Sequence, residues 1–157
     1  MKLCLLCIGK TDLGFVKEAN DIYLNRLKHY IQTDLEVIQE HKSWKKMKVA
    51  ERMKAEGLAI TERIKPNDVV YLLDEKGKQY SSHGFSELLQ KRMNSGVNRV
   101  VFVVGGAFGF SDEIYIRYPQ KISLSKMTFS HQMIRSFFLE QIYRAMTILS
   151  GEPYHNS

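Results

Sequence analysis

The chain has 157 residues, of which 44% are hydrophobic and 25% charged, so it has the size and composition of one ordinary globular domain. Its 23 lysine and arginine residues exceed its 17 aspartate and glutamate residues, and the net charge of +6 favours a polyanionic partner, nucleic acid above all. No apolar run approaches the ~20 residues of a membrane span, and the opening residues lack the pattern of a signal peptide. We therefore expect one domain over residues 1–157, located in the cytoplasm and without membrane contact.

Strand-like and helix-like segments alternate five times along the chain. Short apolar runs predict strands at residues 2–8, 35–38, 69–73, 100–104 and 122–124. Amphipathic spacing predicts helices over 13–30 and 44–64, two short ones near 85–93 and 111–118, and a long one from Phe129 to Leu149. This alternation predicts an α/β fold with a parallel-rich sheet flanked by helices.

The first predicted strand contains the only two cysteines, Cys4 and Cys7. Residues three apart on a strand point to opposite faces and lie ~10 Å apart, which is too far for a disulfide. No second pair of ligands completes a zinc site. We predict two buried core thiols and no metal.

Residues 42–54 contain six basic residues, one acidic residue and Trp44. Two interpretations stay open. The segment is either a solvated helix face or a phosphate-contacting surface on which the tryptophan stacks against a base. Lys45, Lys46 and Lys48 are the candidate phosphate contacts.

Three glycines, Gly105, Gly106 and Gly109, follow the fourth predicted strand and let a ligand approach the backbone closely. The loop fits neither the dinucleotide fingerprint nor the P-loop. In a parallel sheet it shares the carboxyl edge with Leu73 and residues 124–129, and ligands bind at that edge. Apolar side chains would form the walls of this site and backbone groups would supply its hydrogen bonds. This combination predicts an adenosine-bearing cofactor without a pyrophosphate. A side chain added at Gly106 is expected to fill the ligand space.

The stretch from 122 to 151 turns at residues 126–128 and then continues as the long helix. Thr128 or Ser130 can cap the start of this helix, where free N–H groups lie. Its apolar positions exceed what one face can bury, and Phe137, Phe138 and Tyr143 are the candidates for the excess. Exposed patches of this kind mark interfaces, so we expect a two-fold homodimer.

Four motifs occur in order along the chain: GGAFG at 105–109, LSKMTFSHQ at 124–132, EQIYRA at 140–145 and PYH at 153–155. In order, spacing and total length they resemble the RlmH family of the SPOUT class of methyltransferases, and the resemblance covers the whole chain. The block 126–132 and the terminal Tyr-His are its specific parts. The sequence departs from the family at Ser130, where many relatives have proline, and this puts the rigidity of the turn in doubt.

The resemblance implies a fold whose C-terminal part threads a deep trefoil knot, which general topology rules would exclude. It implies that the knot binds S-adenosylmethionine in a bent form and that a homodimer places each site at the subunit interface. The implied reaction is methylation of N3 of a pseudouridine in a stem-loop of large-subunit (23S) rRNA, with the assembled ribosome as the expected substrate. The candidate cofactor contacts are Leu73, Gly105, Gly106, Leu124, Ser125, Lys126, Met127, Thr128 and Phe129.

The reacting N3 of the uracil ring must lose its proton, and Glu140, His155 or water could accept it. A surface ion pair with Arg144 is the simpler interpretation of Glu140. Arg135 could hold a phosphate or stabilise the enolate-like oxygen. Tyr154 and His155 are candidate substrate contacts, although a polar tail is usually frayed. Because the tail lies one helix length from the cofactor loop, we expect it to complete the partner's site.

Two other function classes compete with this one. A non-catalytic RNA-binding module of ribosome assembly would keep the basic surface but would not need the glycine loop and the apolar walls. A dinucleotide-dependent oxidoreductase would need the fingerprint that this sequence lacks. Binding of S-adenosylmethionine separates the methyltransferase from both.

Overall fold

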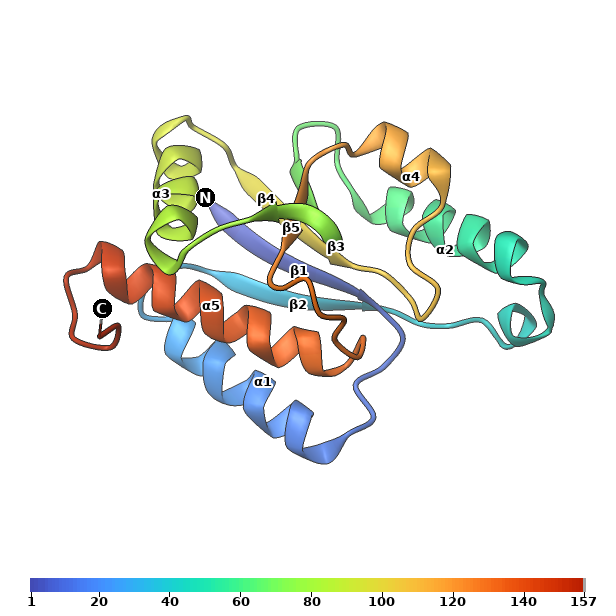
Figure 1. Cartoon of the computed structure of the whole chain (residues 1–157), viewed down its shortest axis with the longest axis horizontal. Coiled ribbons are helices and arrows are strands. Elements are labelled where there is room, and N and C mark those ends of the chain that lie inside the picture. The colour runs from blue at the N-terminus through green and yellow to red at the C-terminus, as the bar shows by residue number, and fades with distance from the viewer. Residues whose placement is uncertain (157) are drawn as a thin grey trace.

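In the computed structural model, which describes residues 1–156, five parallel strands form one sheet in the order β2-β1-β4-β3-β5 (Figure 1). They are β1 (Lys2–Ile8), β2 (Thr33–Ile38), β3 (Val69–Gln79), β4 (Arg99–Val104) and β5 (Lys121–Ser123). The strands with the most continuous apolar runs, β1 and β4, lie inside the sheet, where both faces are covered by helices. The predicted α/β fold with a parallel sheet is confirmed.

Helices cover both faces of the sheet (Figure 1). One face is covered by α1 (Gly14–Leu27), α3 (Ser82–Asn94) and α5 (Met133–Leu149), and α5 packs between the other two. The opposite face is covered by α2 (Val49–Arg63) and α4 (Asp112–Arg117), with the 3-10 turn η1 (Lys42–Lys46) before α2. No helix in the described part of the chain is long and apolar enough to cross a membrane.

The two cysteines lie in different halves of the core. Cys7 packs in the cluster beneath α1, α3 and α5, and Cys4 packs in the cluster beneath α2 and α4. Both thiols are free and buried, which confirms the prediction of two buried core thiols. Burial raises the pKa of Cys4 to about 11 and that of Cys7 to about 12, so both are protonated thiols at neutral pH.

Two predicted helix starts are wrong, each because a local turn replaces the first helical residues. The long helix begins at Met133 rather than at Phe129, and the Ser130 hydroxyl accepts the Met133 N–H at 3.0 Å. The second helix begins at Val49, because the backbone of Met47 and Lys48 is extended after η1. Residues 124–132 are therefore an irregular loop between β5 and α5.

Strand β3 continues six residues past its predicted end through a bulge. Ile122 of β5 pairs with Leu73 before the bulge and with Lys78 after it, so residues 74–77 loop out from the ladder. Gly77 closes the bulge against β5, and a Cβ there would lie 2.6 Å from the backbone nitrogen of Ile122. Only glycine permits this approach.

Replacing Gly77 with alanine should lower the free energy of unfolding by about 1–3 kcal/mol, because the bulge or β5 must move to admit the methyl group. Urea unfolding followed by circular dichroism measures the change. Gly14→Ala is the matched control, since a Cβ at this first residue of α1 meets no heavy atom within 4 Å. Equal effects of the two substitutions would contradict the close approach.

Candidate functional site

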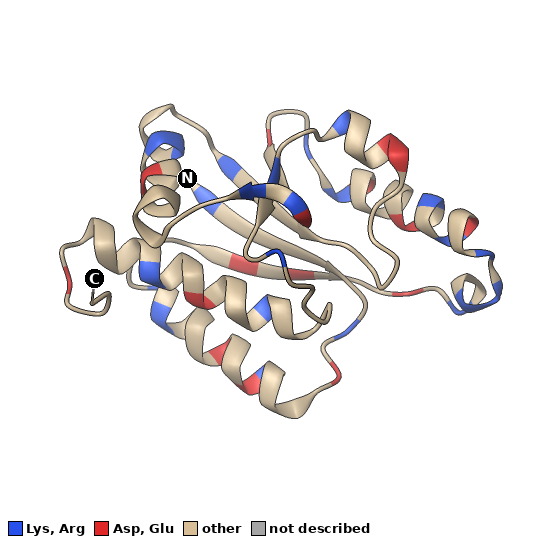
Figure 2. Ribbon diagram, viewed as in Figure 1, with Lys and Arg blue, Asp and Glu red and all other residues tan. Residues whose placement is uncertain are grey.

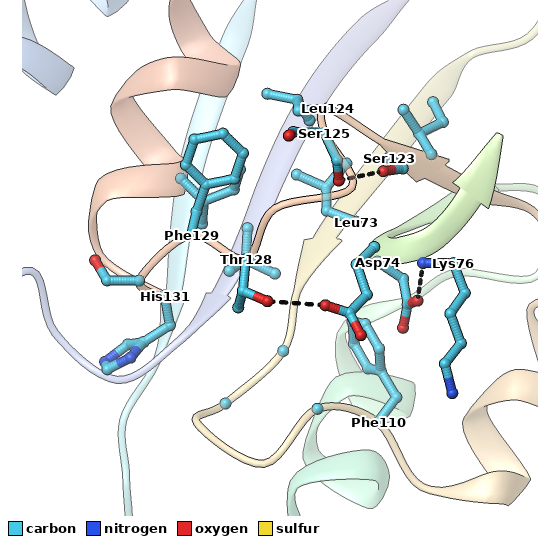
Figure 3. Close-up of a pocket in the computed structure, with 18 of the residues that line it drawn as sticks. Leu73, Asp74, Lys76, Phe110, Ser123, Leu124, Ser125, Thr128, Phe129 and His131 are labelled. Atoms are coloured by element: carbon cyan, nitrogen blue, oxygen red, sulfur yellow. Dashed lines mark hydrogen bonds between the residues drawn. The ribbon is translucent and has the colours of Figure 1, made fainter. Parts of the chain in front are cut away.

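The carboxyl ends of β3, β4 and β5 enclose a cavity of about 510 Å³ (Figure 3). Its walls come from the β3 bulge, from the glycine loop after β4 with Tyr115 of α4, and from residues 122–134. Eight of the nine candidate cofactor contacts line it: Leu73, Gly105, Gly106, Leu124, Ser125, Met127, Thr128 and Phe129. Lys126 is exposed and lies outside the lining. The topology thus gathers the segments that the sequence placed at one sheet edge.

The glycine loop, residues 105–109, is a tight turn that packs against Glu56 of α2. The Gly109 N–H donates to the Gly106 carbonyl at 3.1 Å, and Gly109 has φ +80°, a conformation that favours glycine. A Cβ at Gly106 would lie 2.8 Å from Oε1 of Glu56, which is 2% exposed. The expectation that a side chain at Gly106 would fill the ligand space was therefore wrong, because that side chain would point at Glu56. The missing side chain of Gly106 makes room for a buried carboxylate, while the backbone of the loop faces the cavity.

That carboxylate belongs to a small network on α2. Arg52 Nε donates to Glu56 Oε1 at 2.8 Å, and its Nη2 donates to Glu40 Oε1 at 2.9 Å. The same guanidinium lies 5.5 Å from the ring centroid of Phe108, which lines the cavity. Helix α2 therefore contacts the glycine loop at two points, through the cation–π contact of Arg52 with Phe108 and through the Glu56 carboxylate beside Gly106.

The β3 bulge brings two carboxylates to the cavity, which the sequence analysis missed. Tyr115 donates its hydroxyl to Asp74 Oδ2. Thr128 donates to Glu75 Oε2 at 2.9 Å, the bond drawn as a dashed line from Thr128 in Figure 3. Burial, together with the hydrogen bond to Asp74, raises the pKa of Tyr115, so this phenol stays protonated. Two carboxylates directly after a strand end were the available signal, because polar residues at that edge are aimed at the ligand site.

Arg135 lies in the first turn of α5 and is fully buried, at 0% exposure. Its Nη2 donates to the Ile8 carbonyl at 2.8 Å, its Nη1 to the Gly9 carbonyl at 3.0 Å and to Thr11 Oγ1 at 2.9 Å. Its Nε donates to the His131 carbonyl at 3.0 Å. The proposed phosphate or enolate contact is contradicted, because solvent does not reach the guanidinium and four of its five N–H groups are already bonded.

Gln132 reinforces the same junction between α5 and the β1–α1 loop. Its Oε1 accepts the backbone N–H groups of Asp12 at 2.9 Å and Leu13 at 3.1 Å. His131, the neighbouring residue, lines the cavity. The cavity wall at 128–134 is thus anchored to the carboxyl end of β1.

The C-terminal tail is folded onto α5 rather than frayed. Glu140 Oε1 accepts from Arg144 Nη2 at 2.6 Å and from the Tyr154 hydroxyl at 3.2 Å. The Tyr154 ring packs edge-on against Tyr143 with centroids 4.7 Å apart. Arg144 Nη1 lies 3.2 Å from His155 Nδ1. Glu140 and Arg144 therefore form the expected ion pair, and that pair also holds the tail.

These contacts bear on which group could accept a proton. Arginine only donates, so the contact makes His155 Nδ1 the acceptor and leaves the proton on Nε2. Both Glu140 oxygens are bonded too, since Oε2 accepts from Gln141. Burial, the neighbouring Tyr23 hydroxyl and the hydrogen bond that Tyr154 donates to the Glu140 carboxylate raise the pKa of Tyr154 and keep it protonated. His155 has no free acceptor nitrogen in this arrangement, and Glu140 accepts hydrogen bonds on both oxygens, three on Oε1 and one on Oε2.

The cavity and the tail lie at opposite ends of one helix (Figure 1). Helix α5 has 17 residues, and at ~1.5 Å per residue it separates its two ends by ~25 Å. Ser130 and His131 belong to the cavity end, whereas Glu140, Arg144 and the tail belong to the other. The structure brings the candidate residues together in two groups rather than one.

The basic segment before α2 has a buried aromatic anchor. Trp44 is 6% exposed, packs in the core and lies 5.5 Å from the His41 ring, which contradicts the interpretation in which it stacks on a base. Lys45, Lys46 and Lys48 are exposed around it. Figure 2 shows basic residues gathered where η1 meets α2, at one end of the molecule.

The prediction of which apolar side chains of α5 are exposed was partly wrong. Phe138 is 1% exposed and packs against Phe102 in the core, and Tyr143 is half-buried between Tyr23 and Tyr30. Phe137 is exposed, and so is Phe15 on the neighbouring α1. Helical periodicity could not tell which of two adjacent phenylalanines faces the sheet.

Comparison with known proteins relates the whole chain to one group. The family described as "Predicted SPOUT methyltransferase" matches residues 1–155. The chain is 52% identical over 156 residues to a ribosomal RNA large subunit methyltransferase H of Christiangramia forsetii, with 99% of each chain covered. The proteins with the same name from Parabacteroides distasonis and Porphyromonas gingivalis are 53% and 49% identical, each over 156 residues and 99% of both chains.

Replacing Arg135 with methionine should lower the free energy of unfolding by about 2–4 kcal/mol, because two buried carbonyls and one partly buried carbonyl lose their donor. Urea unfolding measures the loss. Arg117→Met on α4 is the control. Within residues 1–156, the side chain of this exposed arginine has only a cation–π contact with Tyr118, so the substitution should change stability by less than about 1 kcal/mol. If both variants were equally stable, Arg135 would not hold this junction.

Proposed function

From the premise that the chain belongs to the SPOUT methyltransferase family, we propose that it methylates large-subunit ribosomal RNA with S-adenosylmethionine as the methyl donor. The observation that carries the proposal is the cavity at the carboxyl edge of β3, β4 and β5, lined by eight of the candidate cofactor contacts. A non-catalytic RNA-binding module has no need of such a cavity. We place the reaction in the cytoplasm, where ribosomes are.

The residues present fit S-adenosylmethionine. A cavity of about 510 Å³ lies within the usual range of ~300–1,000 Å³ for small-molecule sites. Leu73, Leu124 and Phe129 offer apolar walls for an adenine ring, and the backbone of 105–109 and 124–131 offers hydrogen bonds. Asp74 and Glu75 supply negative charge, which suits a cationic ligand. When bound, the cofactor supplies a methyl group that its sulfonium has already activated.

We further propose that the acceptor is N3 of a pseudouridine in a 23S rRNA stem-loop on the assembled ribosome, as the family resemblance implies. The chain's part in the chemistry is then to hold N3 in line with the methyl group, and orientation can lower such a barrier by up to ~7–11 kcal/mol. Because Glu140 and His155 are engaged with Arg144, the N3 proton passes to water in this proposal. In the same proposal, the exposed residues Lys45, Lys46 and Lys48 bind phosphates of the RNA.

The same proposal includes a homodimer and the knotted passage of the C-terminal segment, which the resemblance implies. The exposed faces of Phe15 and Phe137 suit a contact between α1–α5 layers of two copies. If the two α5 helices pack antiparallel, the tail of one subunit reaches the cavity of the other. Tyr154 and His155 would then complete the partner's site.

Large ribosomal subunits incubated with tritiated S-adenosylmethionine test the activity. The wild type should transfer label, whereas Thr128→Arg should lose it at least ~100-fold, since a bulky cation in the cavity displaces the cofactor. Calorimetry should show that this variant no longer binds S-adenosylmethionine. Lys91→Gln, an exposed change on α3, is the control and should retain both properties. Cofactor binding without transfer to subunits or bare rRNA would reject the proposed substrate.

Mixing two inactive variants tests the tail. Thr128→Arg keeps its tail, and a chain ending after Glu152 keeps its cavity. If the tail acts on the partner, each mixed dimer has one intact site, and random exchange should restore about a quarter of wild-type activity. A tail that acts within its own chain leaves every site damaged. Mixed dimers without activity, or a fully active truncated chain, would exclude the trans arrangement.

A further inference from the structure

We propose that Arg26, held against Tyr23 and Tyr143 at the C-terminal ends of α1 and α5, is a phosphate-contacting residue that positions the RNA strand beside the tail. The inference rests on the proposed function, because it names a contact of the same RNA substrate. It concerns a surface outside the cavity and outside the basic segment at residues 42–54.

Four tyrosine rings meet at this surface, and they come from α1, the α1–β2 turn, α5 and the tail. Tyr143 lies at the centre, with ring centroids 6.0 Å from Tyr23, 5.8 Å from Tyr30 and 4.7 Å from Tyr154. All four rings are half-buried, so each keeps some exposed surface. The hydroxyl of Tyr30 donates to Glu152 at 2.6 Å, which ties the tail to the same cluster.

The guanidinium of Arg26 lies 5.5 Å from the ring centroids of both Tyr23 and Tyr143. It is exposed, and it forms no ion pair or side-chain hydrogen bond within residues 1–156. Other arginines differ: Arg52 and Arg99 are each bonded to two carboxylates. Two rings therefore fix the direction of a cation whose N–H donors remain available.

A fixed guanidinium with free donors matches a phosphate oxygen in charge and geometry. Next to it, Arg144 lies 4.8 Å from the Tyr154 ring, and basic residues mark the adjacent ends of α1 and α5 (Figure 2). Arginine combined with exposed aromatic rings is the usual composition of a single-stranded RNA surface. The position of Arg26 in the last turn of α1 also stabilises the helix dipole, but that role would leave RNA binding unaffected.

The location fits a strand that enters the partner's cavity. Arg26 lies at the tail end of the α1–α5 layer, and the antiparallel dimer proposed above brings this end to the other subunit's cavity. A nucleotide in that cavity would have its neighbouring phosphates near Arg26. The residue would therefore affect binding of RNA but not of the cofactor.

The test compares Arg26→Gln with Lys17→Gln, which removes an exposed charge from the same helix nine residues away. Binding of large ribosomal subunits to each variant is measured between 50 and 300 mM salt. Loss of one phosphate contact should weaken binding about five- to tenfold and reduce the slope of log K against log salt by about 0.7–0.9. Arg26→Lys should recover part of the slope, and Lys17→Gln should match the wild type.

Two further measurements separate this inference from others. Calorimetry with S-adenosylmethionine should give the wild-type affinity for Arg26→Gln, and light scattering should give an intact dimer. An unchanged salt slope, or a slope equal to that of Lys17→Gln, would overturn the phosphate contact. Loss of the dimer would also overturn it and make Arg26 an interface residue. If the wild type binds ribosomal subunits but transfers no methyl group, the proposed activity fails while the Arg26 contact is still tested by binding.

Discussion

The arrangement of the candidate site depends on how the buried guanidinium of Arg135 is satisfied. It lies at the N-terminal end of α5, where the helix dipole is already positive, and no carboxylate in the described chain pairs with it. A buried charge without compensation would be very unfavourable. Carbonyls at the carboxyl end of β1 compensate it, because strand-end carbonyls have no partner further along the ladder. The same bonds fix the last loop of the cavity to the centre of the sheet.

Close backbone approach provides the second constraint. Gly77 lets the β3 bulge touch β5, and Gly106 lets the loop after β4 rest on Glu56. In each case the absent side chain permits close packing against protein, and the backbone of Gly106 also lines the cavity. The carboxylates of Asp74 and Glu75 reach the cavity only because the bulge turns residues 74–77 out of the ladder. Irregular backbone beside a regular sheet therefore forms the site.

Sequence patterns were sufficient for what depends on periodicity and chain order. The five strands, the parallel sheet and the gathering of Leu73, the glycine loop and residues 124–129 at one edge follow from apolar runs that alternate with helices. Sequence patterns were insufficient to tell whether a particular side chain is buried in the core or exposed to solvent. Arg135 and Trp44 carry polar atoms that suggest exposure, yet both are buried because their neighbours from distant segments satisfy or cover them. Phe137 and Phe138 differ by one helical position, about 100°, which decides between solvent and core.

The tail shows why a polar C-terminus need not be frayed. Its contacts reach back to α5 through Glu140 and Arg144 and to the α1–β2 turn through Tyr30, so several weak bonds act on one short segment. Ordering a residue's backbone costs ~1–2 kcal/mol, and a tail ordered before the substrate arrives spares that cost on binding. The hydrogen bond to Glu152 raises the pKa of Tyr30 to about 12, so this attachment persists across the neutral range. A rigid tail at the far end of α5 cannot serve its own cavity without leaving these contacts. In the antiparallel dimer proposed above, the tail would serve the second copy while keeping these contacts, and this is the physical argument for a working unit of two chains.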